Sequence, residues 1–144
     1  MTHPKIRVFL TGGSGLVGHN VLEHPAVSKL EILAPGSREL NLFDYEAVRA
    51  YIAKVNPDII IHAAGRVGGI QANIKEPTAF LLENLDMGRN LIWAAKQCGV
   101  RKLINLGSSC MYPRGAANPL KEEMILGGGL EPTNEGYALA KIVV

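Results

Sequence analysis

The sequence predicts an α/β fold in which helices cover both faces of a doubly wound parallel sheet. A glycine-rich turn at residues 11–18 separates an apolar, β-branched stretch at residues 5–10 from a segment with helical spacing. Strand-like and helix-like segments then alternate along the chain. One of them, at residues 59–64, reads as a continuous apolar run, which is typical of a strand buried on both faces of a parallel sheet.

The composition is that of an ordinary globular protein. The chain has 144 residues, 47% hydrophobic and 19% charged, which is enough for one domain with a real core. Its net charge is +2 and the basic residues are scattered, which argues against a nucleic-acid partner. The two cysteines make no disulfide framework, and residues 1–5 show no signal-peptide pattern. No apolar run approaches the roughly 18–20 residues of a membrane helix, so we expect a soluble protein of the reducing cytoplasm.

The glycine-rich turn reads Thr11-Gly-Gly-Ser-Gly-Leu-Val-Gly18. Gly12 would allow a tight turn, Gly15 a close approach to a pyrophosphate, and Gly18 close packing of the helix on the strand. Free N–H groups at the helix N-terminus would bind the phosphates. An ordinary strand-to-helix turn also needs small residues, but the alternating pattern favours a Rossmann-like, NAD(P)-binding domain over residues 1–144. The cofactor-binding candidates in the turn are Gly12, Gly13, Ser14, Gly15, Leu16, Val17 and Gly18.

The end of the second predicted strand bears on the choice of cofactor. The first helix should end near residue 24, before a proline, and residues 30–33 form the strand. NAD sites usually place an acidic residue after this strand to bind the ribose 2′-hydroxyl. Here Ser37 and Arg38 suit a 2′-phosphate instead, which predicts NADP(H) over NAD(H). The alternative is that Arg38 is a solvated loop charge and Glu39 serves the ribose.

Two further strands complete the predicted sheet. Asp44 is predicted to cap a helix that ends at the Asn-Pro-Asp breaker of residues 56–58, and strands follow at 59–64 and 102–107. In a sheet of order 3-2-1-4, the fourth strand lies beside the first, so its carboxyl end opens toward the glycine turn. His62 is expected to be a packed or hydrogen-bonded core residue, since a lone histidine makes no metal site.

Several segments between these elements are candidates for contact with the cofactor. The small residues at 63–65 would either let the adenine side of the cofactor approach the backbone or pack beneath a loop. Residues 66–73 predict a mobile, ligand-facing loop, and a long helix should run from about 77 to 98. Asn84 in that helix faces solvent or hydrogen-bonds to backbone or cofactor. The remaining cofactor-binding candidates are Ser37, Arg38, Leu40, Asn41, Leu42, Ala63, Ala64, Gly65, Asn84, Leu106, Gly107 and Lys141.

Candidate reactive groups follow the fourth predicted strand. The chain there reads Gly107-Ser-Ser-Cys-Met-Tyr-Pro113, a Gly- and Pro-rich loop follows, and helical character resumes at residue 135. Tyr137 and Lys141 are four residues apart and therefore share one face of this helix. Because an adjacent ammonium favours the phenolate, we expect Lys141 to lower the pKa of Tyr137 from its usual value of about 10 and improve proton transfer.

Three motifs together resemble the nucleotide-sugar epimerase group of the extended short-chain dehydrogenase/reductases. They are the glycine turn, the block at residues 107–113, and Tyr137-x-x-x-Lys141. Within that group, Val67-Gly-Gly-Ile70 and Glu131-Pro-Thr-Asn-Glu135 are similar to sequences of the GDP-4-keto-6-deoxy-mannose epimerase-reductases. The resemblance spans nearly the whole chain.

The resemblance implies a role for each reactive residue. Ser108 would hold the 4-keto oxygen of the sugar, and Tyr137 would donate a proton to it. Lys141 would bind the nicotinamide ribose and tune Tyr137, and Cys110 would shuttle protons at the carbons that are epimerised. NADPH would reduce the keto group, and the substrate would be a nucleotide sugar of the GDP-4-keto-6-deoxy-mannose type.

The resemblance also sets expectations for assembly and extent. Helices starting near residues 77 and 135 resemble those of an intersubunit four-helix bundle, which implies a homodimer of the full-length form. Family members continue into a substrate-binding portion with a histidine paired to the cysteine, and Gly136 stands where proline is common. Because the chain stops at Val144, we expect a cofactor domain that is inactive alone, with the C-terminal substrate portion absent. The alternatives are another nucleotide-sugar epimerase, dehydratase or 4-reductase of the family, or a non-catalytic dinucleotide-binding module.

Overall fold

The computed structural model describes residues 5–144, and residues 1–4, where we expect no signal peptide, lie outside this range. The chain divides into two compact units. The first contains residues 5–65 and Met87–Leu106, and the second contains Arg66–Asp86 and Gly107–Val144. Helix α4 (Pro77–Gln97) contributes residues to both units.

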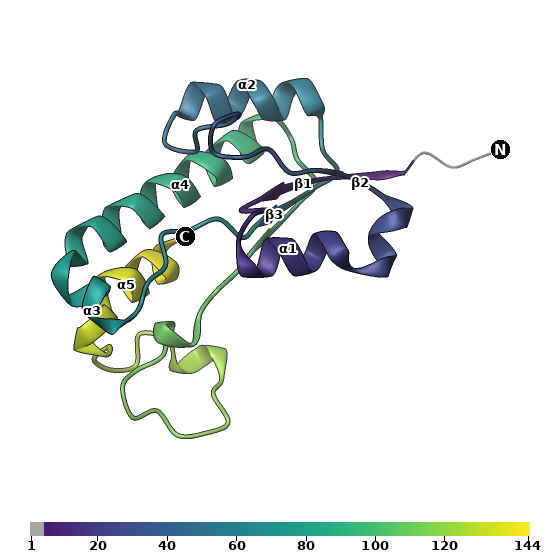
Figure 1. Ribbon diagram of the computed structural model, residues 1–144. Coiled ribbons are helices and arrows are strands. Elements are labelled where there is room, and N and C mark those ends of the chain that lie inside the picture. The colour runs from purple at the N-terminus through teal and green to yellow at the C-terminus, as the bar shows by residue number, and fades with distance from the viewer. Residues whose placement is uncertain (1–4) are drawn as a thin grey trace. The chain divides into compact units, whose positions relative to one another are not determined.

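The first unit is built on a four-stranded parallel sheet (Figure 1). The strands are β1 (Ile6–Thr11), β2 (Leu30–Leu33), β3 (Ile59–His62) and β4 (Lys102–Asn105). All pairings are parallel. Strand β1 is paired on both sides, because Phe9 lies opposite Leu33 of β2 and opposite Ile60 of β3. The parallel sheet predicted from the alternating pattern is therefore confirmed.

The predicted strand order, 3-2-1-4, is wrong. The observed order is β2-β1-β3-β4, so β4 lies beside β3 and not beside β1. The reason is that residues 34–44 form no strand beyond β2, so the chain crosses to the other side of β1 after two strands instead of three. The order therefore reverses at β1. Ligands of open α/β sheets bind at the carboxyl ends of the strands at such a switch point, where β1 leads into the glycine turn.

Helices cover both faces of this sheet, as predicted. Helix α1 (Leu16–Glu23) lies on one face, and α2 (Tyr45–Val55) with the later part of α4 lies on the other (Figure 1). The Asp44 carboxylate caps α2 by accepting a hydrogen bond from the Ala47 N–H at 3.0 Å. The core on the α2 face consists of Phe9, Leu40, Val48, Ile52, Ile60, Leu91, Ala94 and Ala95.

The second unit is helical and rich in turns. Helix α3 (Ile70–Lys75) packs against the 3₁₀ turn Pro132–Asn134, and α5 (Glu135–Val143) packs against the 3₁₀ turn Ser109–Met111. A third 3₁₀ turn is formed by Glu122–Met124. The prediction of a loop through residue 73 is wrong, since α3 begins at residue 70. Among residues 5–144, no helix combines the length and apolarity that crossing a membrane requires.

Gly136 in α5 is explained by close packing within the second unit. A Cβ atom built at this position would lie 2.5 Å from the carbonyl oxygen of Pro77 and 3.2 Å from its carbon. Both are backbone atoms, so a flexible side chain cannot yield to relieve the overlap. The glycine at this position therefore lets α5 approach the start of α4.

Candidate cofactor and active sites

The glycine turn is shaped by two positions that leave no room for a side chain. Gly12 has φ of 71°, and a Cβ atom there would lie 2.6 Å from the Ala64 nitrogen and 2.7 Å from the Ala63 oxygen. A Cβ atom on Gly18 would overlap the carbonyl oxygen of Gly12. The roles predicted for these two glycines, a tight turn and close helix packing, are therefore confirmed by backbone contacts.

The N-terminus of α1 is open to an anion. Gly15 is the N-cap residue, no side chain caps the helix, and the first turn contains no acidic residue. Apart from its two chain neighbours and the backbone of α1, the part of the chain that the structure describes places one atom within 4 Å of a Cβ built on Gly15, the Gly12 oxygen at 3.3 Å, and Leu16 is strongly exposed. Unpaired N–H groups and the positive end of the helix dipole together favour a phosphate here. This geometry fits the pyrophosphate of a dinucleotide.

A buried hydroxyl ties the ends of β1 and β3 together beside this turn. The Thr11 Oγ1 lies 2.8 Å from His62 Nδ1 and accepts a hydrogen bond from the Ala64 N–H at 3.2 Å. Thr11 and His62 are each 2% exposed. The expectation that His62 is a hydrogen-bonded core residue is confirmed.

Thr11→Val should lower the free energy of unfolding by about 1–2 kcal/mol, because the Ala64 N–H loses its acceptor while the side-chain shape is kept. Urea denaturation monitored by circular dichroism measures the effect. The control is Ser28→Ala, which removes an exposed hydroxyl bonded to the Pro25 oxygen and should change the stability by less than about 0.5 kcal/mol. Equal stability of the Thr11 variant and the wild type would contradict this account of the hydroxyl.

The turn after β2 leaves a cation available for a phosphate. Arg38 is exposed and forms no ion pair with any residue from 5 to 144. The Glu39 carboxylate accepts a hydrogen bond from the Gly36 N–H at 2.8 Å, so it is engaged in its own turn. This arrangement favours Arg38, with the neighbouring Ser37, over the alternative in which Glu39 binds a ribose.

The next three cofactor candidates are held by the protein itself. Leu40 is buried in the core, so its side chain is not available to a ligand, and Leu42 is partly buried against that core. The Asn41 Oδ1 accepts a hydrogen bond from the Phe43 N–H at 3.0 Å. Any contact of Leu40 with a cofactor would therefore use backbone atoms, and the assignment of Leu40, Asn41 and Leu42 stays a prediction.

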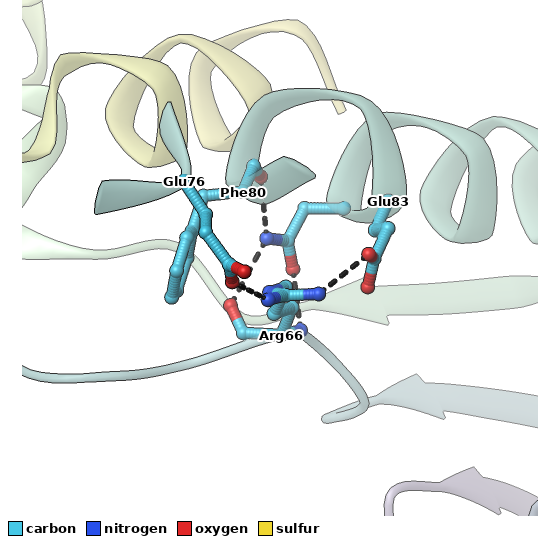
Figure 2. A network of polar contacts seen from close by, with 5 residues as sticks. Arg66, Glu76, Phe80 and Glu83 are labelled. Carbon is cyan, nitrogen blue, oxygen red and sulfur yellow. Dashed lines mark hydrogen bonds and ion pairs between the residues drawn. The ribbon is translucent and has the colours of Figure 1, made fainter. Parts of the chain in front are cut away.

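Arg66 is anchored at the start of the segment that was predicted to be mobile (Figure 2). Its guanidinium forms ion pairs with Glu76 and with Glu83, the latter at 2.6 Å, and lies 5.0 Å from the centroid of the Phe80 ring. The Asn84 side chain accepts from the Arg66 N–H at 2.9 Å and donates to the Arg66 and Phe80 oxygens at 3.0 and 2.7 Å. Of the alternatives for Asn84, hydrogen bonding to backbone is thus confirmed, and cofactor contact stays a prediction.

Asn84→Ala should reduce the free energy of unfolding by about 2–3 kcal/mol, because it leaves the Arg66 backbone without its partners in a buried setting. Thermal and urea unfolding measure this effect. Asn20→Ala is the matched control, since Asn20 makes the same bond to the carbonyl four residues earlier but is exposed, and we expect a change within about 0.5 kcal/mol. Comparable losses in both variants would argue against the anchoring role of Asn84.

The four candidate reactive residues, Ser108, Cys110, Tyr137 and Lys141, all lie in the second unit. The Ser108 Oγ accepts a hydrogen bond from the Cys110 N–H at 3.2 Å, and the turn that carries Cys110 packs against α5, which carries Tyr137. The Lys141 Nζ lies over the Tyr137 ring, 5.9 Å from its centroid. The prediction that Tyr137 and Lys141 share a helix face is confirmed.

The predicted direction of the Tyr137 pKa is wrong. Burial of the phenol raises the pKa of Tyr137, the hydrogen bond with Ser108 lowers it, and the neighbouring Cys110 raises it, with burial the largest effect. Burial likewise lowers the pKa of Lys141, which is only 9% exposed. The sequence places the ammonium near the phenol but does not reveal how strongly the fold removes both groups from water. With its pKa raised, Tyr137 is protonated at neutral pH and can donate a proton.

The sequence analysis missed one residue of this group, Asn134. Its Nδ2 donates a hydrogen bond to the Sγ of Cys110 at 3.1 Å. The two residues are 24 positions apart, and although Asn134 lies in the 131–135 block, no spacing rule links it to the cysteine.

Within residues 5–144, no three His, Cys, Asp or Glu side chains are grouped so as to hold a metal ion.

A parallel sheet with a glycine turn at its switch point, followed by a helix whose N-terminus has no side-chain cap, defines the class of Rossmann-like dinucleotide-binding proteins. More particularly, the chain belongs to the NAD dependent epimerase/dehydratase family, whose model matches residues 8–144. This agrees with the resemblance carried by the sequence motifs.

Two curated relatives and one solved structure are similar to this chain. The chain is 53% identical over 137 residues to a GDP-L-colitose synthase of Yersinia pseudotuberculosis and 50% identical over 137 residues to a GDP-L-fucose synthase of Azorhizobium caulinodans. Each match covers 95% of this chain and 44% of the relative, so the chain spans less than half the length of these proteins. A GDP-D-glycero-L-gluco-heptose synthase from Campylobacter jejuni, solved in the presence of NADPH, matches with a TM-score of 0.91 and 28% identity. That match covers 99% of this chain and 42% of the other.

Proposed function

We propose that this chain is the NAD(P)-binding part of an NADP(H)-dependent epimerase-reductase of GDP-4-keto-6-deoxy sugars, similar to GDP-L-fucose synthase. One observation carries the proposal: the turn that follows Ser108 and contains Cys110 packs against α5, which carries Tyr137, and the Cys110 N–H donates to the Ser108 Oγ at 3.2 Å. Cofactor binding alone needs no such cluster of a phenol, a hydroxyl and a thiol. The named relatives, which are GDP-sugar synthases, support the substrate class.

The residues of the first unit are proposed to hold the cofactor. The N–H groups at the start of α1, after Gly15, bind the pyrophosphate, and Gly12 and Gly18 keep the turn closed on the sheet. Ser37 and Arg38 bind the 2′-phosphate. When bound, NADPH supplies the hydride that reduces the 4-keto carbon.

The residues of the second unit are proposed to act on the sugar. Ser108 and Tyr137 hydrogen-bond to the keto oxygen, which acidifies the C–H bonds on the neighbouring carbons. The Cys110 thiolate takes a proton from such a carbon, and the electron pair moves onto the keto oxygen as an enolate. A second acid on the opposite face then donates a proton to that carbon, which inverts it, while the first proton stays on Cys110. In the reduction, Tyr137 gives its proton to the oxygen as the carbon accepts hydride. Lys141 binds the nicotinamide ribose.

Arg38→Ala should weaken NADPH binding by about tenfold and leave NADH binding unchanged, because a charge-assisted contact to the 2′-phosphate is worth about 1.5–3 kcal/mol. Calorimetry on the 144-residue chain measures both affinities. Arg101→Ala is the matched control, since this exposed arginine lies far along the sequence after α4. Equal affinities of the wild type for NADPH and NADH, unchanged in the Arg38 variant, would overturn the choice of NADP(H).

A different GDP sugar is the second candidate for the substrate. It is favoured by one observation, that relatives of almost equal identity are named for different sugars, L-colitose and L-fucose. Analysis of the products formed from a panel of GDP-4-keto sugars by the full-length protein separates the two.

A homodimer and a cytoplasmic location belong to the same proposal. Both cysteines are free, which agrees with a reducing compartment.

A further inference from the structure

Asn134 lies at a position where an asparagine side chain ordinarily caps a helix. It is the N-cap residue of α5, and asparagine is favoured there because its side chain accepts a hydrogen bond from the second or third helical N–H. In this structure the Asn134 side chain makes no capping bond. It donates instead to the Sγ of Cys110 at 3.1 Å. The Asn134 amide therefore binds the cysteine sulfur and does not cap the helix.

The hydrogen bond from the Asn134 amide to Cys110 is stronger when the sulfur is a thiolate than when it is a thiol. A protonated cysteine sulfur is a weak acceptor, whereas an ionised sulfur forms a charge-assisted hydrogen bond with an N–H donor. The Asn134 Oδ1 is buried and has no hydrogen-bond partner among residues 5–144, so the amide gains little else from this orientation. Cys110 is also held from its other side, because its N–H donates to the Ser108 Oγ at 3.2 Å.

We propose that Asn134 is a positioning residue that fixes the Sγ of Cys110 and favours its thiolate. The inference rests on the proposed function, in which the Cys110 thiolate removes a proton from the sugar carbon. Loss of the amide donor would leave the thiolate less stable and the sulfur free to rotate, which reduces the fraction of Cys110 that is ready to act as a base.

Other charges near Cys110 act alongside the amide. The 3₁₀ turn that carries Cys110 packs against α5, and Tyr137 on that helix interacts with the cysteine. Since a thiolate and a phenolate repel each other, an ionised Cys110 keeps Tyr137 protonated, which is the state that donates a proton. The remaining charged groups on the adjoining elements are Glu135 and Lys141 on α5, and Glu131, which pairs with Arg114 at 3.4 Å.

The pH dependence of Cys110 alkylation tests the proposal. The rate of reaction with iodoacetamide is measured on the 144-residue chain from about pH 5 to about pH 10, in a Cys98→Ser background so that one thiol is observed. Asn134→Ala should shift the profile to higher pH and slow alkylation at pH 7 by about 3- to 10-fold. Asn134→Asp, which places a carboxylate against the sulfur, should shift it further in the same direction.

Thr133→Val is the matched control. It removes the neighbouring hydroxyl, which bonds to Glu131 and not to Cys110, so its alkylation profile should match the wild type. Circular dichroism confirms the folding of each variant, and the Asp variant, with the same shape as asparagine, decides the question if the Ala variant does not fold. Profiles of both Asn134 variants that coincide with the wild type would overturn the proposal.

Failure of the proposed function gives a different result. If Cys110→Ser in the full-length protein still exchanged sugar protons with solvent deuterium, the role of Cys110 as a base would be wrong. The Asn134 alkylation shift would then stand as a property of the thiol alone, and the positioning role in catalysis would be overturned with the base. If Cys110→Ser stopped exchange while the Asn134 variants left both exchange and alkylation unchanged, only the present inference would fail.

Discussion

Tyr137→Phe should lower the rate of GDP-4-keto-sugar reduction by the full-length protein about 10²- to 10⁴-fold while NADPH still binds. The hydroxyl is the proton donor in the proposed reaction, and phenylalanine keeps the ring that lies beneath the Lys141 ammonium. Steady-state kinetics with a GDP-4-keto-6-deoxy sugar gives the rate, and nicotinamide fluorescence gives the affinity for the cofactor.

The pH profile supplies a second readout of the same residue. Reduction requires the protonated phenol, and burial raises the pKa of Tyr137, so activity should persist above the value of about 10 typical of an exposed tyrosine and fall at still higher pH. Tyr51→Phe is the control, since that ring packs on Phe9 in the first unit. A Tyr137 variant with undiminished turnover would remove the phenol from the mechanism. Unaltered cofactor binding and no turnover even in the wild-type full-length protein would favour a non-catalytic binding module.

Gly18→Ala should weaken NADPH binding by at least about tenfold and destabilise the chain by about 1–3 kcal/mol. Helix propensity alone predicts the opposite sign, since alanine stabilises a helix by about 1 kcal/mol relative to glycine. The steric effect should dominate, because the added methyl group would overlap the Gly12 oxygen and lie 2.6 Å from the Gly13 Cα. Both are backbone atoms of the turn that we propose binds the pyrophosphate, so the turn itself must shift.

Calorimetric titration and urea denaturation measure the two effects of Gly18→Ala. Gly129→Ala is the matched control, because among residues 5–144 only its own chain neighbours come within 4 Å of a Cβ built there, and its φ is not in the left-handed region. We expect the control to change stability by less than about 0.5 kcal/mol. A Gly18 variant that binds NADPH as tightly as the wild type would show that the turn does not bind the cofactor.

Local sequence signals were sufficient to place most helices and strands. The Asp44 cap begins α2, Asn56 ends it with φ of 43° before a proline, and Gly99 ends α4 with φ of 69°. These residues act through their own backbone or through neighbours within four positions, so a linear reading captures them. The predicted boundary of α1 before Pro25 was confirmed for the same reason. The predicted loop at residues 66–73 was wrong about where the next helix begins. Helix α3 starts at residue 70, and it lacks a side-chain cap that would mark its start in the sequence.

The candidate site depends more on residues that are far apart in the sequence. The glycine turn and the Tyr137/Lys141 pair could be named from spacing, since each is local. Hydrogen bonds beside them join residues that are distant in the chain: Thr11 and His62 are 51 positions apart, and Asn134 and Cys110 are 24 apart. No periodicity in the sequence encodes such a pairing.

The sequence by itself therefore determined the α/β class, the glycine turn, the bounds of most elements and the family, because these follow from short-range backbone preferences and contiguous motifs. Only the tertiary structure decided the strand order, the anchoring of Arg66 and the direction of the Tyr137 pKa. Strand order depends on which distant edges pair, and a pKa depends on how much water the fold removes from the group. Both are properties of the packed chain, and neither is carried by any single segment of it.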